Sequence, residues 1–302
     1  METPPLADVI INSFDGYSGE VRKAARFVLD NPRDVALLSM REQARRAGVQ
    51  PSTMLRLARQ LGFEGYDPVR DAYANAMRNP ATSFERKARD QQRLQNLGGN
   101  QALAAKIVAS VTRQLEALSA AEQLVRLTDA ATLLARARRV YCLGLRASHP
   151  IAWQLNYILS LVGDKSVLLD DIANTGSDRI RFAGKDDVLF AVTVMPYTQL
   201  TLDIVDYAHK KGVPVVALTD SPVSPLAKRA TITIATTTES PSFYHTMTPA
   251  FVLAEILAVL VAGQGENETL EALRQVDSYH ASLGTHAATR PHPIATPSKE
   301  VQ

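Results

Sequence analysis

Two short helices with a tight turn between them are encoded in Leu38-Ser-Met-Arg-Glu-Gln-Ala-Arg-Arg-Ala-Gly48-Val-Gln-Pro51-Ser-Thr-Met-Leu-Arg-Leu-Ala-Arg-Gln-Leu-Gly62. Met40, Ala44 and Ala47 recur at spacings of four and three residues, so they share one face of the first helix. Gly48 follows as the stop of that helix, because glycine adopts the left-handed backbone of a helix end at little cost. The first helix is therefore expected to end in a tight glycine turn.

The second helix is expected to begin near Pro51 and to end at Gly62, because proline fits the first turn of a helix and glycine its end. Leu55, Ala58 and Leu61 would form its buried face. Two helices joined in this way predict a helix-turn-helix, whose second helix enters the major groove of DNA. The opposite face carries side chains that can bond bases or phosphates: Gln50, Ser52, Thr53, Arg56, Arg59 and Gln60.

Charge separates this interpretation from an ordinary helical hairpin with a solvated face. Residues 33–62 hold six arginines against Asp34 and Glu42, a local net charge of +4, whereas the whole chain has 33 basic and 31 acidic residues. Positive charge gathered in one segment is typical of proteins that contact phosphates. We expect Gln50, Ser52, Thr53 and Arg56 to read bases, and Arg45, Arg46 and Arg59 to hold phosphates.

Length and composition indicate a protein of about two domains, since 302 residues with 46 % apolar content exceed one domain of roughly 150 residues. The single cysteine, Cys142, excludes an internal disulfide and a cysteine-rich metal site. No residue pattern requires a metal or a cofactor. The first residues do not resemble a signal peptide, and the apolar stretch 251–262 is too short to span a bilayer. We therefore expect a soluble, cytoplasmic protein.

The chain divides by composition into four parts. Residues 1–78 are expected to form the helical DNA-binding domain, and residues 79–100 a charged linker with some helix in its middle. Residues 101–280 would form a second domain with a leading helix, and residues 281–302 an unstructured tail without apolar periodicity. The persistent apolar period of residues 101–134 requires that this leading helix pack against another element or a partner chain.

Short apolar runs alternate with helices after residue 140. The alternation predicts an α/β fold with a five-stranded, parallel, doubly wound sheet, because parallel strands are covered by helices on both faces. The expected strands are 140–143, 167–169, 188–194, 213–219 and 231–235, and the helices between or after them are 147–162, 200–211 and 248–262.

Polar side chains follow several of these runs. Because ligands of open parallel sheets bind beyond the carboxyl ends of the strands, we expect a ligand site there. Hydroxyl groups, helix N-termini and one arginine suit an anion or a polyol. The candidate ligand-binding residues are Arg146, Ser148, Thr193, Tyr197, Thr198, Glu239 and Ser240.

The combined pattern resembles the RpiR (MurR/RpiR) family of bacterial transcriptional regulators, which join a DNA-binding domain to a sugar-isomerase (SIS) domain. The resemblance implies a dimer or tetramer that binds an operator in double-stranded DNA and responds to a small metabolite, often a phosphosugar. It covers roughly residues 6–262. The matching segments are Leu38-Ser-Met-Arg-Glu-Gln-Ala, Ala47-Gly-Val-Gln-Pro-Ser-Thr, Leu61-Gly-Phe-Glu-Gly-Tyr, Gly144-Leu-Arg-Ala-Ser, Ala217-Leu-Thr-Asp-Ser-Pro-Val-Ser-Pro-Leu-Ala and Glu239-Ser-Pro-Ser-Phe.

The second phosphate loop departs from the family pattern. Ser148 lies where that pattern places its first loop serine, but the usual Ser-x-Ser-Gly-x-Thr reads Thr193-Val-Met-Pro-Tyr-Thr198 here. Met195 removes a hydroxyl and Pro196 removes a backbone N–H, which leaves the threonines, Thr201 among them. The residues therefore allow a carboxylate, a polyol or a ring as well as a phosphate, and the ligand stays open.

We expect a sequence-specific transcriptional regulator that acts as a repressor. Its activity would be controlled by a sugar phosphate or a related sugar or acid, and it would not be an enzyme. The alternative is an aldose–ketose isomerase, which needs a general acid–base pair. Only Glu239 and His245 suggest such a pair, and a fold by itself does not carry an activity. A pure scaffold protein would bind neither DNA nor metabolite.

Overall fold

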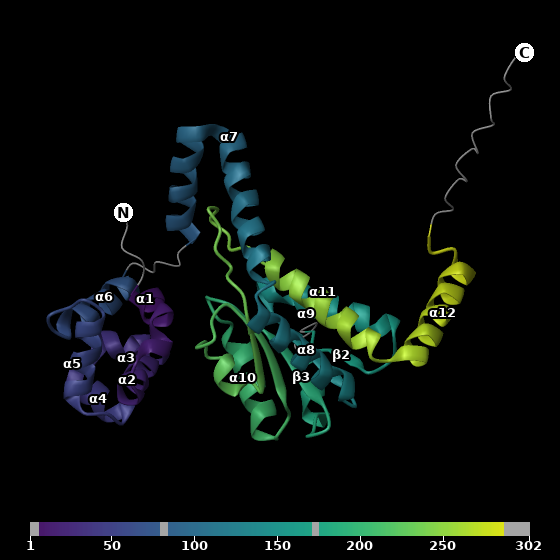
Figure 1. Cartoon of the computed structure of the whole chain (residues 1–302), viewed down its shortest axis with the longest axis horizontal. Helices are drawn as coiled ribbons and strands as arrows, with labels where there is room; N and C mark the ends of the chain where they lie inside the picture. The colour runs from purple at the N-terminus through teal and green to yellow at the C-terminus, as the bar shows by residue number, and fades with distance from the viewer. Residues whose placement is uncertain (1–5, 79–83, 171–174, 287–302) are drawn as a thin grey trace, which may run out of the picture.

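A computed structural model describes residues 6–78, 84–170 and 175–286. Their helices and strands form a helical amino-terminal part and an α/β carboxy-terminal part (Figure 1). The amino-terminal helices are α1 (Leu6–Asn12), α2 (Gly19–Asp30), α3 (Pro32–Leu37), α4 (Met40–Ala47), α5 (Pro51–Gln60) and α6 (Asp67–Arg78).

The predicted helix-turn-helix is formed by α4, the turn at Gly48 and α5. Ser39 caps α4 by accepting a hydrogen bond from the backbone N–H of Glu42, 3.3 Å away. Gly48 ends the helix with φ of 67°, the left-handed conformation expected of it. The buried amide of Gln43 then ties α4 to α3, because its Nε2 donates to the carbonyl of Val35 at 3.0 Å.

The buried face of α5 differs from the prediction by one position. Met54 and Leu57 are fully buried, whereas Leu55 is only half-buried. Met54, Leu57, Ala58 and Leu61 follow the i, i+3, i+4, i+7 spacing of an amphipathic helix, so this register buries a methionine and a leucine instead of Leu55. The rotation also moves Thr53 into the interior.

The carboxy-terminal part contains a five-stranded parallel sheet in the order β2-β1-β3-β4-β5. Apolar side chains of α8, α9 and α11 cover one face, and α10 covers the other, so the α/β, doubly wound prediction is confirmed. The elements are α8 (Ala121–Arg136), β1 (Val140–Gly144), α9 (His149–Leu161), β2 (Ser166–Leu168), β3 (Val188–Val192), α10 (Gln199–Lys210), β4 (Val215–Thr219), β5 (Ile232–Ala235), α11 (Thr248–Gly263) and α12 (Glu266–Leu283).

A long helix, α7 (Phe84–Ala117), precedes the sheet and is bent at Gly99, where φ is 74°. We call residues 84–98 its first arm and residues 100–117 its second arm; Figure 1 shows them as the two limbs of an inverted U. The first arm occupies most of the segment that we expected to be a linker. Helix α12 extends three residues into the expected tail, of which residues 287–302 lie outside the described chain. The division into domains at residues 78, 100 and 280 stays a prediction.

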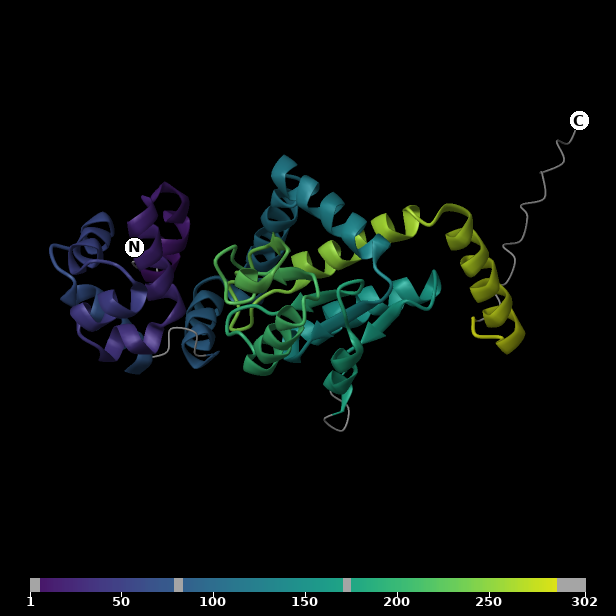
Figure 2. The same ribbon diagram turned by 90° about the horizontal axis from the view of Figure 1, so that it is seen from below.

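The two parts of the chain contact each other at α2 and at the segment that follows β4. The Arg26 guanidinium donates to the carbonyl of Val223 at 3.0 Å, and Asp30 forms an ion pair with Lys228. The side chain of Val223 is buried among the apolar residues of the amino-terminal part. Figure 2 shows this part beside the sheet when the molecule is seen from below.

Among the described residues, no single helix is long and apolar enough to cross a membrane. Helices α11 and α12 satisfy the length and composition criteria only as a pair, with a bend of 111° between them. One face of α11 is buried in the core of the α/β part. Apolar core helices satisfy the same length and composition criteria as membrane-spanning helices.

Candidate functional site

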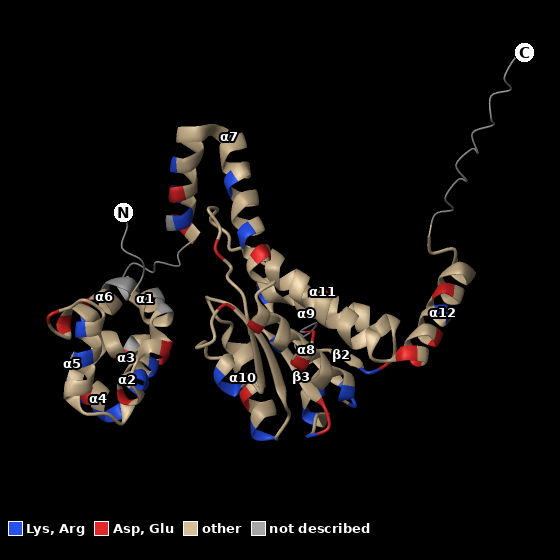
Figure 3. Cartoon of the chain, viewed as in Figure 1, with Lys and Arg blue, Asp and Glu red and all other residues tan. Residues whose placement is uncertain are grey.

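The candidate DNA-reading face of α5 is exposed over most of its length. Gln50, Ser52, Arg56 and Arg59 are exposed at the residue level, and Figure 3 marks the basic positions along this helix. Thr53 does not belong to this face. Its exposure is 3 %, and its hydroxyl accepts a hydrogen bond from Arg56 Nη2 at 3.3 Å. The expectation that Thr53 offers an exposed hydroxyl to a base is therefore wrong, because the rotation of α5 buries it.

Two of the expected phosphate-binding arginines are engaged by acidic neighbours. Arg45 forms a two-pronged pair with Glu42, with distances of 2.9 and 2.6 Å, and Arg46 reaches both Glu42 and Asp34 at 3.1 and 2.7 Å. The hydrogen bonds from Arg45 and Arg46 lower the pKa of Glu42 to about 2. All four side chains remain partly exposed, so a phosphate could compete for either arginine.

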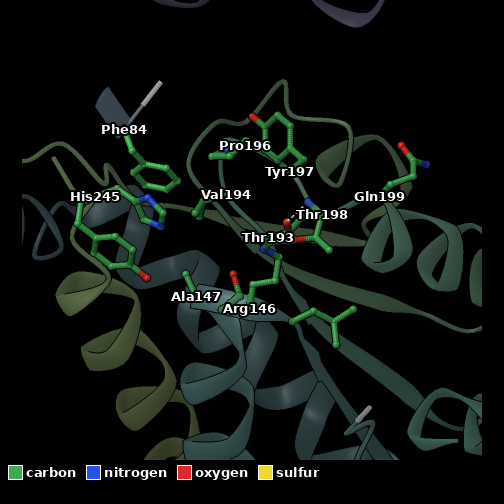
Figure 4. Close-up of a pocket in the computed structure, with 13 residues that line it drawn as sticks. Phe84, Arg146, Ala147, Thr193, Val194, Pro196, Tyr197, Thr198, Gln199 and His245 are labelled. Atoms are coloured by element: carbon green, nitrogen blue, oxygen red, sulfur yellow. Dashed lines mark hydrogen bonds between the residues drawn. The ribbon is translucent and has the colours of Figure 1, made fainter. Parts of the chain in front are cut away.

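A second feature is a pocket of about 500 Å³ at the carboxyl ends of β1 and β3. It lies where ligands of open parallel sheets bind. Figure 4 shows its side chains converging from three loops and from the start of α7. The lining residues are Phe84, Leu145, Arg146, Ala147, Ser148, Thr193, Val194, Pro196, Tyr197, Thr198, Gln199, Tyr244 and His245.

The loop after β1 is shaped by tight backbone packing. A Cβ at Gly144 would lie 2.4 Å from the carbonyl oxygen of Ser148, so only glycine permits this approach. Arg146 has φ of 56°, a left-handed conformation that costs a non-glycine residue about 1–2 kcal/mol. Strain of this kind is found at binding sites, where surrounding structure holds it in place. The loop thus brings the predicted residues Arg146 and Ser148 to the pocket.

The loop after β3 brings Thr193, Tyr197 and Thr198 to the pocket, as predicted, but its donors are largely used within the protein. The Thr193 hydroxyl accepts from the backbone N–H of Thr198 at 3.1 Å. The Asp220 carboxylate accepts from the backbone N–H of Met195 at 3.1 Å. A carboxylate on this amide opposes an anion at the same place. Asp220 directly follows β4, one of the strand ends where we expect a ligand, but it is neither a predicted ligand-binding residue nor a lining residue of the pocket.

Two predicted residues, Glu239 and Ser240, do not line the pocket. The carbonyl of Glu239 accepts from Gln114 Nε2 of α7 at 2.8 Å, and the Ser240 hydroxyl accepts from the backbone N–H of Ser242 at 3.2 Å. The segment after β5 rises along α7 before it turns back, so its later residues reach the pocket instead. The local sequence pattern carries no signal of this long-range packing.

His245 is one of the pocket residues that the predicted ligand set lacks. It is 8 % exposed, its ring stacks on Tyr244 with centroids 4.6 Å apart, and its buried Nε2 has no hydrogen-bond partner among the described residues. Burial lowers the pKa of His245, and the nearby charge of Lys87 lowers it further, whereas Asp220 opposes the shift. Figure 4 shows the imidazole of His245 among the side chains that line the pocket, and its lowered pKa favours the neutral form there.

Among the described residues, no three or more histidine, cysteine, aspartate or glutamate side chains form a group that could hold a metal ion. The buried Cys142 lies in β1, where burial raises the pKa of its thiol. It is packed in the core as the sequence suggests.

Known proteins resemble both the helical amino-terminal part and the α/β carboxy-terminal part of the chain. Residues 133–260 match the family model of the SIS domain. HexR of Pseudomonas aeruginosa, a transcriptional regulator of the helix-turn-helix type, is 27 % identical over 274 residues. The match covers 85 % of this chain and 88 % of HexR.

Two solved structures share the fold. The sugar isomerase domain of an RpiR transcription factor from Sphaerobacter thermophilus superimposes with a TM-score of 0.55 at 24 % identity, over 58 % of this chain and 98 % of that one. The structure of Vibrio vulnificus NanR in complex with ManNAc-6P superimposes with a TM-score of 0.51 at 21 % identity. The match covers 92 % of this chain and 98 % of NanR. Residues 133–260 therefore form a SIS domain, and the chain is similar over most of its length to a transcriptional regulator of the helix-turn-helix type.

Proposed function

We propose that this chain is a sequence-specific, DNA-binding transcriptional regulator whose SIS domain binds a small metabolite. The observation that carries the proposal is the presence on one chain of a helix-turn-helix with an exposed basic helix, α5, and a pocket at the ligand-binding edge of a SIS sheet. The identity with HexR extends over both parts, which supports a regulator in preference to an isolated sugar-binding domain.

In DNA recognition, α5 would lie in the major groove with its amino-terminal half toward the bases. Ser52 and Arg56 are exposed there, and Gln50 stands at the turn that precedes them. Arg59 forms no ion pair with any described residue, so its guanidinium is available to a phosphate. Arg45 and Arg46 would join it after exchanging their acidic partners for phosphates.

The pocket suits an anionic sugar derivative. Arg146 and the Ser148 hydroxyl offer a positive charge and a donor at one loop, while the partly exposed ring of Phe84 offers an apolar surface for one side of a sugar ring. The Asp220 carboxylate already accepts the hydrogen bond of the Met195 backbone N–H. The anion would therefore lie toward the loop of Arg146 and not toward the loop after β3. The presence of ManNAc-6P in NanR supports a sugar phosphate as the first class to test.

The remaining features of the proposal follow from this role. The protein would act in the cytoplasm as a homo-oligomer, repress transcription, bind no metal or cofactor and catalyse no reaction. Isomerisation is less well supported because His245 lines the pocket while Glu239, the other half of the candidate acid–base pair, does not. Turnover assays with phosphosugars would distinguish the two functions.

The deciding experiment is a fluorescence-anisotropy titration with DNA from the region upstream of the protein's own gene, at two salt concentrations. We expect specific binding that scrambled DNA cannot displace at the higher salt. Arg56→Ala should lose about 1–3 kcal/mol, roughly 5- to 150-fold in affinity, and relax specificity. Arg59→Ala should weaken all sequences alike and reduce the salt slope by about one.

The matched control is Arg274→Ala, which removes an exposed arginine from α12, far from α5 in the fold. It should bind operator like the parent protein. Binding that vanishes with salt and is equal for both DNAs, or an Arg56→Ala variant with parental affinity, would contradict the proposal.

A further inference from the structure

The loop of residues 236–247, between β5 and α11, lies between the two arms of α7. Figure 1 shows it as the green segment that rises inside the inverted U. We call it the aromatic loop, because Phe243 and Tyr244 lie in it beside His245. One side of this loop forms part of the pocket, and its other contacts are with α7.

The first arm of α7 contacts the aromatic loop at two well-separated positions. The Phe84 ring stacks on Tyr244 with centroids 6.3 Å apart and meets the edge of Phe243 at 6.4 Å. Two turns further along, Gln91 Oε1 accepts from the backbone N–H of Phe243 at 3.0 Å. The charge of Lys87, which lies between these positions, acts on His245.

The second arm holds the opposite end of the same loop. Gln114, which is largely buried, donates to the carbonyl of Glu239 at 2.8 Å, and Ser110 approaches the same oxygen at 3.5 Å. Leu115 near the end of this arm packs against the core of the SIS domain, and Leu118, directly after the arm, is buried in that core. The second arm is thus fixed to the SIS domain independently of the pocket.

The first arm has no comparable anchor. Phe84 is 49 % exposed, and every described side chain of the arm is exposed or only half-buried. Segments with few buried contacts separate from the body of a protein at low free-energy cost. Gly99 supplies the pivot, since its left-handed backbone already turns the helix there. The position of the first arm therefore depends on its contacts with the aromatic loop.

Phe84 and His245 also line the pocket itself, side by side in Figure 4. A ligand that bonds the unpartnered Nε2 of His245 would touch the aromatic loop and Phe84 together. Phe84 is the first residue of α7, at the end of the first arm that is nearer in sequence to the amino-terminal part. A ligand shifts such an equilibrium only if it prefers one arrangement of the arm.

We propose that Phe84 of α7 and the aromatic loop read the occupancy of the pocket, so that a ligand alters DNA binding by changing how the first arm docks. This inference rests on the proposed function and adds the route by which the pocket reaches α5. A second route runs from Asp220 through Val223 to α2, and the experiment separates the two.

Occupancy can be imposed without knowing the ligand, by attaching N-ethylmaleimide to a cysteine placed at the pocket wall with Ala147→Cys. The native Cys142 is buried and stays unreactive. Lys185→Cys, at an exposed site near the amino end of β3, provides a labelled control. Each protein is measured as the full chain, before and after labelling, for operator affinity by anisotropy and for amide hydrogen exchange of residues 84–98 by mass spectrometry.

We expect labelling of Ala147→Cys to change operator affinity about fivefold or more and to change exchange in the first arm, whereas labelling of Lys185→Cys changes neither. In the Ala147→Cys protein that also carries Phe84→Ala, labelling should no longer affect operator affinity. Gln91→Ala should weaken the response, and Gln92→Ala, an exposed neighbour with no contact to the loop, should preserve it.

A response of operator affinity that persists in the Phe84→Ala background would overturn the inference and favour the route through Val223. Labelling that leaves affinity and exchange unchanged would overturn it as well. If the parent protein binds no operator, the proposed function fails; exchange in the first arm then still decides whether occupancy moves the arm.

Discussion

Glu42 places a carboxylate among the arginines that we expect to contact DNA. Its two oxygens hold Arg45 and Arg46, and both arginines lower the pKa of Glu42 to about 2, so the carboxylate is charged at every physiological pH. An ion pair that is exposed at a DNA-binding surface competes with phosphate contacts. Affinity for DNA then depends on breaking pairs as well as on forming them.

Glu42→Gln should therefore raise operator affinity and steepen its salt dependence, because Arg45 loses its acidic partner and becomes available to a phosphate, whereas Arg46 keeps Asp34. Each additional phosphate contact adds about 0.9 to the slope of log affinity against log salt, so an increase of about one is expected. Anisotropy titrations at several salt concentrations measure it. Glu20→Gln, which releases Lys23 on α2, is the matched control. An unchanged slope for Glu42→Gln would mean that Arg45 does not reach the DNA.

His245 makes the stability of the protein depend on pH. Burial is the main reason that its pKa in the folded chain lies below the ordinary value of 6.5, with Lys87 adding to the shift. A base whose folded pKa is lowered binds fewer protons in the folded than in the unfolded state. Its stabilisation is then complete above the unfolded pKa and is lost as the pH falls through 6.5 toward the folded pKa.

The free energy of unfolding should accordingly fall as the pH is lowered below 6.5, and His245→Gln should remove part of that fall. Urea denaturation at pH 8 and at several pH values below 6.5 compares the two proteins. His209→Gln, at an exposed position near the end of α10, should retain the parental pH profile. Equal profiles for the parent and His245→Gln would show that the imidazole is not held neutral by burial.

At the scale of elements, the turn between α4 and α5 sets the direction of α5, the helix that we propose reads DNA. Gly48 adopts φ of 67° and its N–H closes the end of α4, so the chain reverses before Pro51 begins α5. No atom lies within 4 Å of a Cβ built at Gly48, so a substitution meets backbone strain alone. The turn can therefore be tested without a steric clash.

Gly48→Ala should destabilise the amino-terminal part by about 1–2 kcal/mol, the cost of a left-handed conformation for a residue with a Cβ. Thermal or urea unfolding followed by circular dichroism measures it. Gly65→Ala is the control, since that glycine also has open space around it but no left-handed backbone. Equal stability of the two variants would contradict the role assigned to the turn.

Elements with a strong periodic pattern were predictable from the sequence, and contacts between distant elements were not. The five strands and the helix-turn-helix follow from apolar spacing and from glycine and proline signals. The prediction placed Thr53 on the exposed face of α5, but the helix is rotated so that Thr53 is buried. This rotation buries Met54 and Leu57, which together bury more apolar surface than Leu55 can. Glu239 was misplaced because α7 draws its carbonyl away from the pocket, a contact between residues 125 positions apart.

The same contrast applies within the pocket. Arg146, Ser148, Thr193 and Thr198 were predictable, since each follows a strand whose carboxyl end lies at the ligand-binding edge. His245 lies ten residues beyond the end of β5, so its approach to the pocket depends on the path of the aromatic loop between the arms of α7. No local sequence pattern encodes that path.

At the scale of the whole molecule, the carboxy-terminal helices leave apolar side chains without a partner. Val259 of α11 is 60 % exposed, the stacked rings of Trp153 and Tyr157 on α9 are also exposed, and α12 projects from the body with no buried residue (Figure 1). Exposure of apolar side chains on helices that contact one another, as α9, α11 and α12 do, is typical of a protein–protein interface. It supports the proposed homo-oligomer, in which a second copy would cover these helices.

Val259→Arg should weaken self-association by placing a charge in that interface. Light scattering coupled to size-exclusion chromatography, over a range of concentrations, measures the mass. Phe182→Arg, an exposed aromatic position near the amino ends of the strands, is expected to leave the mass unchanged. A Val259→Arg protein with the parental mass would exclude this face of α11 from the contact between subunits.

The contact of Arg26 and Asp30 with Val223 and Lys228 has a consequence for the DNA itself. Because this contact holds the amino-terminal part against the SIS domain of the same chain, that part cannot turn freely. In a symmetric pair of subunits, two such contacts would fix the distance between the two α5 helices. Half-sites in DNA repeat their orientation only every 10–10.5 base pairs. In the proposed regulator, this contact would make the choice of operator depend on the spacing between half-sites as well as on their sequence.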